Sequence, residues 1–140
     1  MIDSYDVCGK ALAEKYSTKY YASLAEAMKS CTKIDGICLS TPTFAHKACI
    51  AEAANLGIAI FTEKPIGENA EDIIDCFNIC RLNNVPLCCG FQRRFDSTYR
   101  AVREKVRRGK LMRITIYYYF SPVILSTLSR NVPPTYIVIV

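Results

Sequence analysis

The sequence contains no apolar run of the roughly 20 residues that a membrane-spanning helix requires. Its first ten residues also lack the basic stretch, followed by an apolar one, that marks a secretory leader. No internal repeat and no low-complexity segment is present. We therefore expect a cytoplasmic protein without a membrane partner.

Patterns that hold a metal are also missing from the sequence. It has one histidine, His46, and its eight cysteines form no Cys-x-x-Cys pair. Most of the cysteines stand inside apolar segments, so we predict packed, reduced thiols rather than disulfides or a metal site. Two close pairs, Cys76 with Cys80 and Cys88 with Cys89, leave redox activity as the alternative.

What is present is the composition of one globular domain, with 140 residues, 51% hydrophobic and 22% charged. The net charge of +5 is concentrated, because residues 93–113 hold nine basic residues against two acidic ones. Arg100, Arg103 and Arg107 would form one basic face of a helix. This favours a solvated helix, with nucleic acid or another polyanion as the alternative contact.

Strand-like and helix-like segments alternate along residues 1–110, which predicts an α/β fold around a mostly parallel sheet. Two-residue alternation then begins in residues 111–120 and favours a half-buried antiparallel strand. We therefore divide the chain into domains at 1–110 and 111–140. The first expected strand ends at Asp3, and the other expected strands lie at 19–22, 34–40, 58–62 and 86–90. The expected helices lie at 7–16, 24–30, 44–56, 69–82 and 97–108.

Three motifs stand at the ends of expected strands: Ser40-Thr41-Pro42-Thr43 with His46, Glu63-Lys64-Pro65-Ile66, and Gly90-Phe91-Gln92-Arg93-Arg94-Phe95-Asp96. Their order and spacing resemble the glucose-fructose oxidoreductase and inositol 2-dehydrogenase family, over residues 1–118. The resemblance looks closest to the inositol dehydrogenase branch. It implies an incomplete doubly wound, Rossmann-like sheet, followed by the start of an antiparallel-sheet domain that receives the substrate.

The resemblance implies a cofactor site at the ends of the strands. Asp3 matches the acidic residue that hydrogen-bonds an adenosine ribose, which favours NAD over NADP. The backbone of Ser40, Thr41 and Pro42 would line the cofactor path. His46 would lie near the cofactor, although a structural role for this histidine stays open.

Lys64 is the candidate catalytic residue, flanked by Glu63 and Pro65 in the second motif. Its ammonium would contact the nicotinamide ribose and a substrate hydroxyl, favouring the alkoxide as hydride leaves the carbon. The alternative is a surface lysine in a loop. Gln92 and Arg93 would face the substrate pocket, while Arg94 would pair with an acid such as Asp96 or support the fold.

Departures from the family pattern are as informative as the matches. The Gly-x-Gly-x-x-Gly turn and the strand before it are not found, which would leave a gap of roughly 9.6 Å beside Asp3 that nothing in the sequence fills. The Asp-x-x-x-His pair that supplies the family's general base is also missing.

We therefore expect a fragment of an NAD-dependent oxidoreductase that acts on the CH–OH group of a polyol or sugar. The fragment would be inactive alone. Two alternatives remain: a non-enzymatic binding module that uses the basic segment 93–113, and an interaction fragment that pairs through its C-terminal strand edges. The C-terminal sheet would also be the route to a homo-oligomer.

Overall fold

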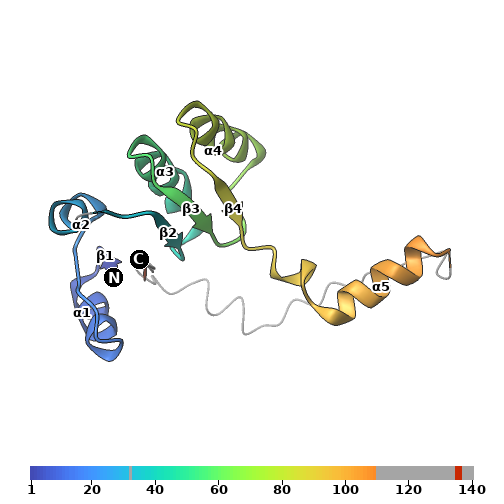
Figure 1. The fold of residues 1–140 in the computed structure, drawn as a ribbon, viewed down its shortest axis with the longest axis horizontal. Coiled ribbons are helices and arrows are strands. Elements are labelled where there is room, and N and C mark those ends of the chain that lie inside the picture. Colours follow the sequence, from blue (N-terminus) through green and yellow to red (C-terminus); the bar gives the residue numbers. More distant parts are fainter. Residues whose placement is uncertain (32, 110–134, 137–140) are drawn as a thin grey trace. The chain divides into compact units, whose positions relative to one another are not determined.

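The computed structural model describes residues 1–31, 33–109 and 135–136 (Figure 1). The described residues fall into two units, the first containing Met1–Gly90 with 135–136 and the second containing 91–109. The elements are β1 (Ile2–Asp3), α1 (Asp6–Lys15), α2 (Leu24–Ser30), β2 (Gly36–Leu39), α3 (Thr43–Asn55), β3 (Ala59–Thr62), α4 (Ala70–Leu82), β4 (Leu87–Cys89), a 3-10 turn η1 (Gln92–Arg94), α5 (Ser97–Arg107) and β5 (Thr135–Tyr136).

Three strands form the parallel sheet that the alternating pattern predicts. They run in the order β2-β3-β4, with Leu39 opposite Thr62 and Thr62 opposite Cys89. Helices α3 and α4 lie side by side along this sheet (Figure 1). The predicted α/β, Rossmann-like fold is therefore confirmed in the first unit, and its elements agree with the expected ranges to within about two residues.

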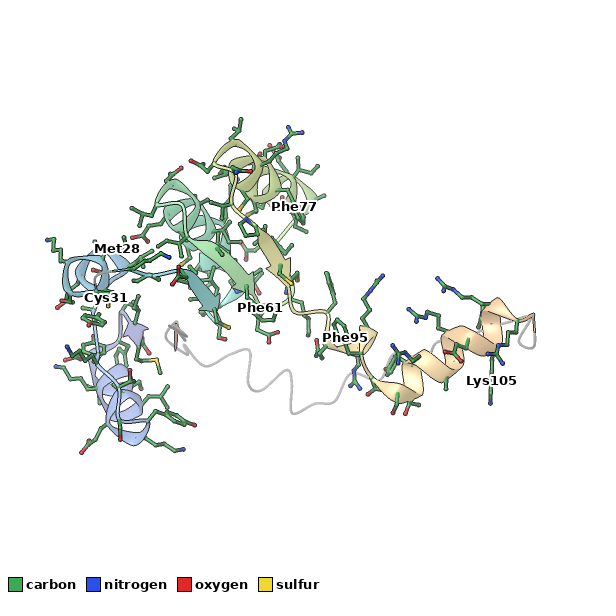
Figure 2. The ribbon with its side chains drawn as sticks, in the orientation of Figure 1. Met28, Cys31, Phe61, Phe77, Phe95 and Lys105 are labelled. Carbon is green, nitrogen blue, oxygen red and sulfur yellow. The ribbon has the colours of Figure 1, made fainter. Side chains whose placement is uncertain are left out.

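The hydrophobic core lies between this sheet and the two helices. Along β2 and β3, burial alternates, so that Leu39 and Ile60 are buried together with Ile50 of α3. Phe61 stays 40% exposed and points away from α3 and α4 (Figure 2). Parallel sheets are usually covered on both faces. Here the second face carries an open apolar groove of about 570 Å³, lined in part by Cys38, Phe61 and Cys88.

Side-chain caps fix where two of the helices begin. The hydroxyl oxygen of Ser23 accepts from the backbone N–H of Glu26 at 3.1 Å, and the Glu26 carboxylate accepts from the N–H of Ala22 at 2.7 Å. Ser23 is therefore the N-cap of α2, and Glu26 reaches back to the residue that precedes this cap. Asn69 caps α4 by accepting from the N–H of Asp72 at 2.9 Å.

Strand β1 departs from the expected arrangement on both edges. The predicted strand at 19–22 is wrong in extent: it consists of one parallel bridge between Tyr21 and Ile2, with three hydrogen bonds between this segment and residues 1–3. On the other edge, β5 pairs antiparallel with β1. The expectation that nothing in the sequence lies beside Asp3 is therefore also wrong, since Thr135 is its partner.

A cavity of about 240 Å³ separates β1 from the three-stranded sheet. Its lining comes from both sides and includes Ile2 of β1, Leu24 of α2, and Ile37 and Leu39 of β2. These side chains are mostly apolar. The expected separation between the first strand and the remaining parallel strands is therefore present as a cavity.

The second unit consists, within the described residues, of η1 and α5. Asp96 caps α5 by accepting from the N–H groups of Thr98 and Tyr99. All residues of α5 are exposed. The predicted antiparallel strand at 111–120 lies outside the described residues, and the domain boundary at 110 stays a prediction. None of the described helices is long and apolar enough to cross a membrane.

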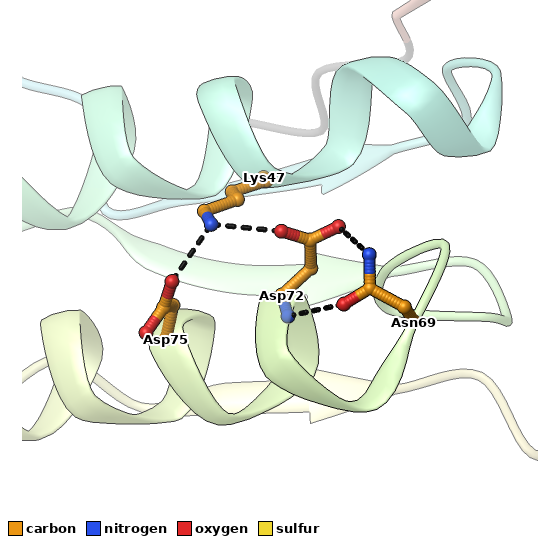
Figure 3. Close-up of polar contacts among 4 residues, drawn as sticks. All are labelled: Lys47, Asn69, Asp72 and Asp75. Atoms are coloured by element: carbon orange, nitrogen blue, oxygen red, sulfur yellow. Dashed lines mark hydrogen bonds and ion pairs between the residues drawn. The ribbon is translucent and has the colours of Figure 1, made fainter.

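One charged cluster joins the two helices that cover the sheet. The ammonium of Lys47 on α3 contacts the carboxylates of Asp72 and Asp75 on α4, each at 2.7 Å (Figure 3). The side chain of Asn69 donates to the other oxygen of Asp72 at 2.8 Å. Hydrogen bonds to the two carboxylates raise the pKa of Lys47 well above its usual range. One cation thus screens two acids from each other.

Replacing Lys47 with methionine should lower the melting temperature, because Asp72 and Asp75 would then repel each other without a cation between them. The measurement is a thermal melt at low salt and at about 1 M salt, where screening should shrink the difference. Lys10→Met is the matched control, since Lys10 pairs with a single carboxylate, that of Asp6, on the exposed surface of α1. An equal effect of both substitutions at low salt would contradict the role of the cluster.

The eight cysteines differ widely in exposure. Cys76 and Cys80 are buried on α4, and burial raises the pKa of both thiols. Cys8 and Cys88 are exposed. A thiol reacts as the thiolate, so a raised pKa and burial both slow alkylation.

Alkylation of the folded chain, followed by mass spectrometry, should therefore modify Cys8 and Cys88 first, and Cys76 and Cys80 last. The same reagent in denaturant should label all four at similar rates. Early labelling of Cys76 or Cys80 in the folded chain would show that α4 does not pack as described.

Candidate functional site

The candidate site lies where two parallel strands end side by side. Segment 40–42 follows β2 and segment 63–65 follows β3, so both begin at the same edge of the sheet. The N–H of Glu63 donates to the carbonyl oxygen of Leu39 at 2.9 Å and forms the last bond between these strands. In parallel α/β sheets, ligands bind at this carboxyl edge.

His46 connects the two segments beyond the end of the strands. Its side chain is buried, with 1% exposed. Nε2 lies 2.8 Å from the carbonyl oxygen of Thr41, and Nδ1 lies 2.7 Å from the carbonyl oxygen of Pro65. The ring therefore faces the backbone of both motif segments, and the expected place of His46 near the cofactor stays a prediction. Any effect of His46 on a ligand would be indirect.

Thr41 contributes an unusual polar group to this edge. The residue is buried, and its hydroxyl oxygen has no hydrogen-bond partner within residues 1–31, 33–109 and 135–136. Its neighbour Pro42 accepts from the N–H of Ala45 as α3 begins. A buried hydroxyl without a partner costs free energy, so it indicates a place where a ligand or water supplies the missing bond.

The backbone of Lys64 is hydrogen-bonded, whereas its side chain is exposed. The residue is exposed, and its N–H donates to the Glu63 carboxylate at 3.3 Å. The Lys64–Pro65 peptide is cis, and Ile66 is buried after it, which anchors the segment. Among the described residues, no carboxylate forms an ion pair with the ammonium. The ammonium can therefore approach a ligand without breaking an existing pair.

Asp3 occupies the carboxyl end of β1 and is fully buried. Oδ1 accepts from the N–H of Tyr5 at 2.9 Å, while Oδ2 has no partner in the part of the chain that the structure describes. The Tyr20 hydroxyl donates to the carbonyl oxygen of Asp3, and Gly9 packs so closely that a Cβ there would lie 2.7 Å from Asp3 Cβ. The backbone around Asp3 is thus fixed, and half of its carboxylate remains available for a hydrogen bond.

Gln92 and Arg93 belong to η1 in the second unit, and both are exposed. The guanidinium of Arg93 lies 3.6 Å from Asp96 and stacks over the Tyr99 ring at 5.1 Å. The sequence predicts that Arg94 pairs with Asp96, but the structure pairs Asp96 with Arg93, three residues before it. A place for Gln92 and Arg93 in a substrate pocket stays a prediction, as do both interpretations of α5.

Sequence reasoning missed one polar residue near these groups. Ser4 directly follows Asp3 and lines the cavity between β1 and β2, together with Glu52 of α3. Its position after a strand-ending acidic residue is the signal that could have identified it. Glu52 offered no comparable signal, because it lies within an ordinary helical pattern.

Comparison with known proteins identifies relatives over most of the chain. The family described as an oxidoreductase family with an NAD-binding Rossmann fold matches residues 2–91. An inositol 2-dehydrogenase from Rhizobium meliloti is 32% identical over 109 residues, which cover 78% of this chain and 32% of that protein. A scyllo-inositol 2-dehydrogenase (NAD(+)) from Bacillus subtilis is 31% identical, with 75% of this chain and 29% of that protein covered.

A solved structure shares the fold. The WlbA dehydrogenase from Bordetella pertussis, in complex with NADH and UDP-GlcNAcA, superposes with a TM-score of 0.72 at 25% identity. The match covers 81% of this chain and 32% of that protein, so the chain spans about a third of the length of its relatives. With the strand-end motifs in place and a family match over residues 2–91, the chain belongs to the glucose-fructose oxidoreductase and inositol 2-dehydrogenase family of oxidoreductases with an NAD-binding Rossmann fold.

Proposed function

We propose that this chain supplies the NAD-binding part of an oxidoreductase that acts on the CH–OH group of a polyol or sugar. The observation that carries the proposal is a pair of buried polar atoms, Asp3 Oδ2 and Thr41 Oγ1, at the carboxyl ends of β1 and β2. Neither atom has a hydrogen-bond partner among the described residues. Lys64 follows the neighbouring strand, β3. The relatives named as inositol dehydrogenases support a polyol as the substrate class.

The unpartnered atoms fit the groups that a dinucleotide presents. A ribose has two adjacent hydroxyls that donate hydrogen bonds, and the free oxygen of Asp3 is an acceptor. A carboxylate at this position also repels a 2′-phosphate, which favours NAD over NADP. Because Asp3 is fully buried, a ribose would have to displace part of its surroundings to reach it.

The segments after β2 and β3 would hold the remainder of the cofactor. The backbone of Ser40, Thr41 and Pro42 would line the cofactor path at the edge of the sheet, and the hydroxyl of Thr41 would add one donor. Glu63 and Pro65 would act by holding the backbone around Lys64.

Lys64 would take the catalytic role in this proposal. NAD, when bound, accepts the hydride from the alcohol carbon. The Lys64 ammonium would donate a hydrogen bond to the alcohol oxygen and stabilise the negative charge that develops there. A second donor position on the same ammonium would contact the nicotinamide ribose. We assign the acceptor of the hydroxyl proton to no residue of this chain.

We further propose that the 140 residues bind NAD without turning over a substrate. The sequence contains neither a Gly-x-Gly-x-x-Gly turn for the pyrophosphate nor an Asp-x-x-x-His pair for the proton transfer. The same proposal includes two further features. Two copies of the chain would assemble through the C-terminal segment, and Gln92 and Arg93 would bind the substrate.

NADH should raise the melting temperature of the chain, and NADPH at the same concentration should raise it less, because Asp3 repels the additional phosphate. Asp3→Asn should reduce this difference between the two cofactors, since the amide carries no charge. The isosteric change keeps the Oδ1 acceptor that receives the Tyr5 N–H. Equal stabilisation of the unmodified chain by both cofactors would contradict the assignment of Asp3.

Lys64→Met should weaken NADH binding about tenfold in a fluorescence titration, because a charge-assisted hydrogen bond to the ribose is lost. Lys29→Met in the last turn of α2 removes the same charge elsewhere and should leave the affinity unchanged. If both variants bind NADH like the unmodified chain, Lys64 does not contact the cofactor.

A further inference from the structure

The two hydrogen bonds of His46 give this side chain a particular place in the site. The residue is the only histidine in the sequence, and it lies in the first turn of α3. Its ring reaches back to Thr41 in the segment after β2 and across to Pro65 in the segment after β3. Among the described residues, this ring is the connection between the two segments once the β2–β3 ladder has ended at Glu63.

Both partners of the ring are backbone carbonyl oxygens, which only accept hydrogen bonds. A neutral imidazole has one N–H and donates to one of them, whereas an imidazolium donates to both. The ring is almost completely buried, so water does not replace either bond. The positions of Thr41 and Pro65 therefore depend directly on what this side chain can donate.

Pro65 directly follows Lys64, and Thr41 carries the unpartnered hydroxyl. A side chain that fixes both carbonyls also fixes the distance between the Lys64 backbone and the segment after β2. We propose that His46 is a positioning residue that acts through Lys64. By fixing the backbone beside Lys64, it keeps the Lys64 ammonium at the place where the ammonium contacts the cofactor. This inference rests on the function proposed above, because it assumes that Lys64 binds NAD.

A purely structural histidine would behave differently. Its removal would destabilise the fold, but the effect of Lys64 on NADH binding would remain the same. A positioning residue instead couples to Lys64, since the ammonium loses its contact once its backbone has moved. A double-mutant cycle measures this coupling, because independent sites give effects that multiply in affinity.

The experiment measures NADH affinity by fluorescence titration of the full chain, of His46→Phe, of Lys64→Met and of the double variant. Phenylalanine keeps a ring of similar size and removes both donors. We expect each single substitution to weaken binding about tenfold, and the double variant to be weakened about tenfold rather than about a hundredfold. A fully multiplicative double variant, or unchanged binding by His46→Phe, would overturn the inference.

Lys47→Met provides the matched control on the same helix, because Lys47 faces α4 rather than the two motif segments. Combined with Lys64→Met, it should show no coupling. If His46→Phe does not fold, His46→Gln and His46→Asn replace it in the cycle. Each amide keeps one donor nitrogen and should couple to Lys64 more weakly than phenylalanine. Failure of the unmodified chain to bind NADH would instead overturn the proposed function.

Discussion

Parallel pairing of β2 with β3 places Leu39 opposite Thr62, and the candidate site depends on this register. The register brings the ends of both strands to one edge, where Glu63 donates to Leu39 and closes the ladder. Packing of α3 and α4 on one face of the sheet holds the strands in place through buried residues such as Ile50 and Ile60. A slip of one residue would exchange the buried and exposed faces of β3 and turn Lys64 away from segment 40–42.

The elements of the parallel sheet could be predicted from the sequence because their signals are local. Ser23 with Glu26 marks the start of α2, and Gly57, with a φ of +72°, marks the turn after α3. Periodic apolar residues define α3 and α4. The strand-end motifs could be located for the same reason, since their residues are consecutive in the chain.

Other features could not be predicted because they join residues far apart in the sequence. The pairing of β5 with β1 connects Thr135 to Asp3, and no pattern in either segment indicates the other. The contact of Lys47 with Asp72 and Asp75 depends on how α3 and α4 pack. Likewise, the family resemblance predicts His46 near the cofactor, while its two backbone partners and its burial became visible only in the fold.

The most direct test of the account is an amide NMR titration of the full chain with NADH. If the carboxyl edge of the sheet binds NAD, the largest shifts should lie in residues 3–5, 40–43 and 63–66, and the amides of α4 should change little. Shifts centred on α4 or on the groove beside Phe61, or no saturable shifts at all, would contradict the assignment of this edge as the cofactor site.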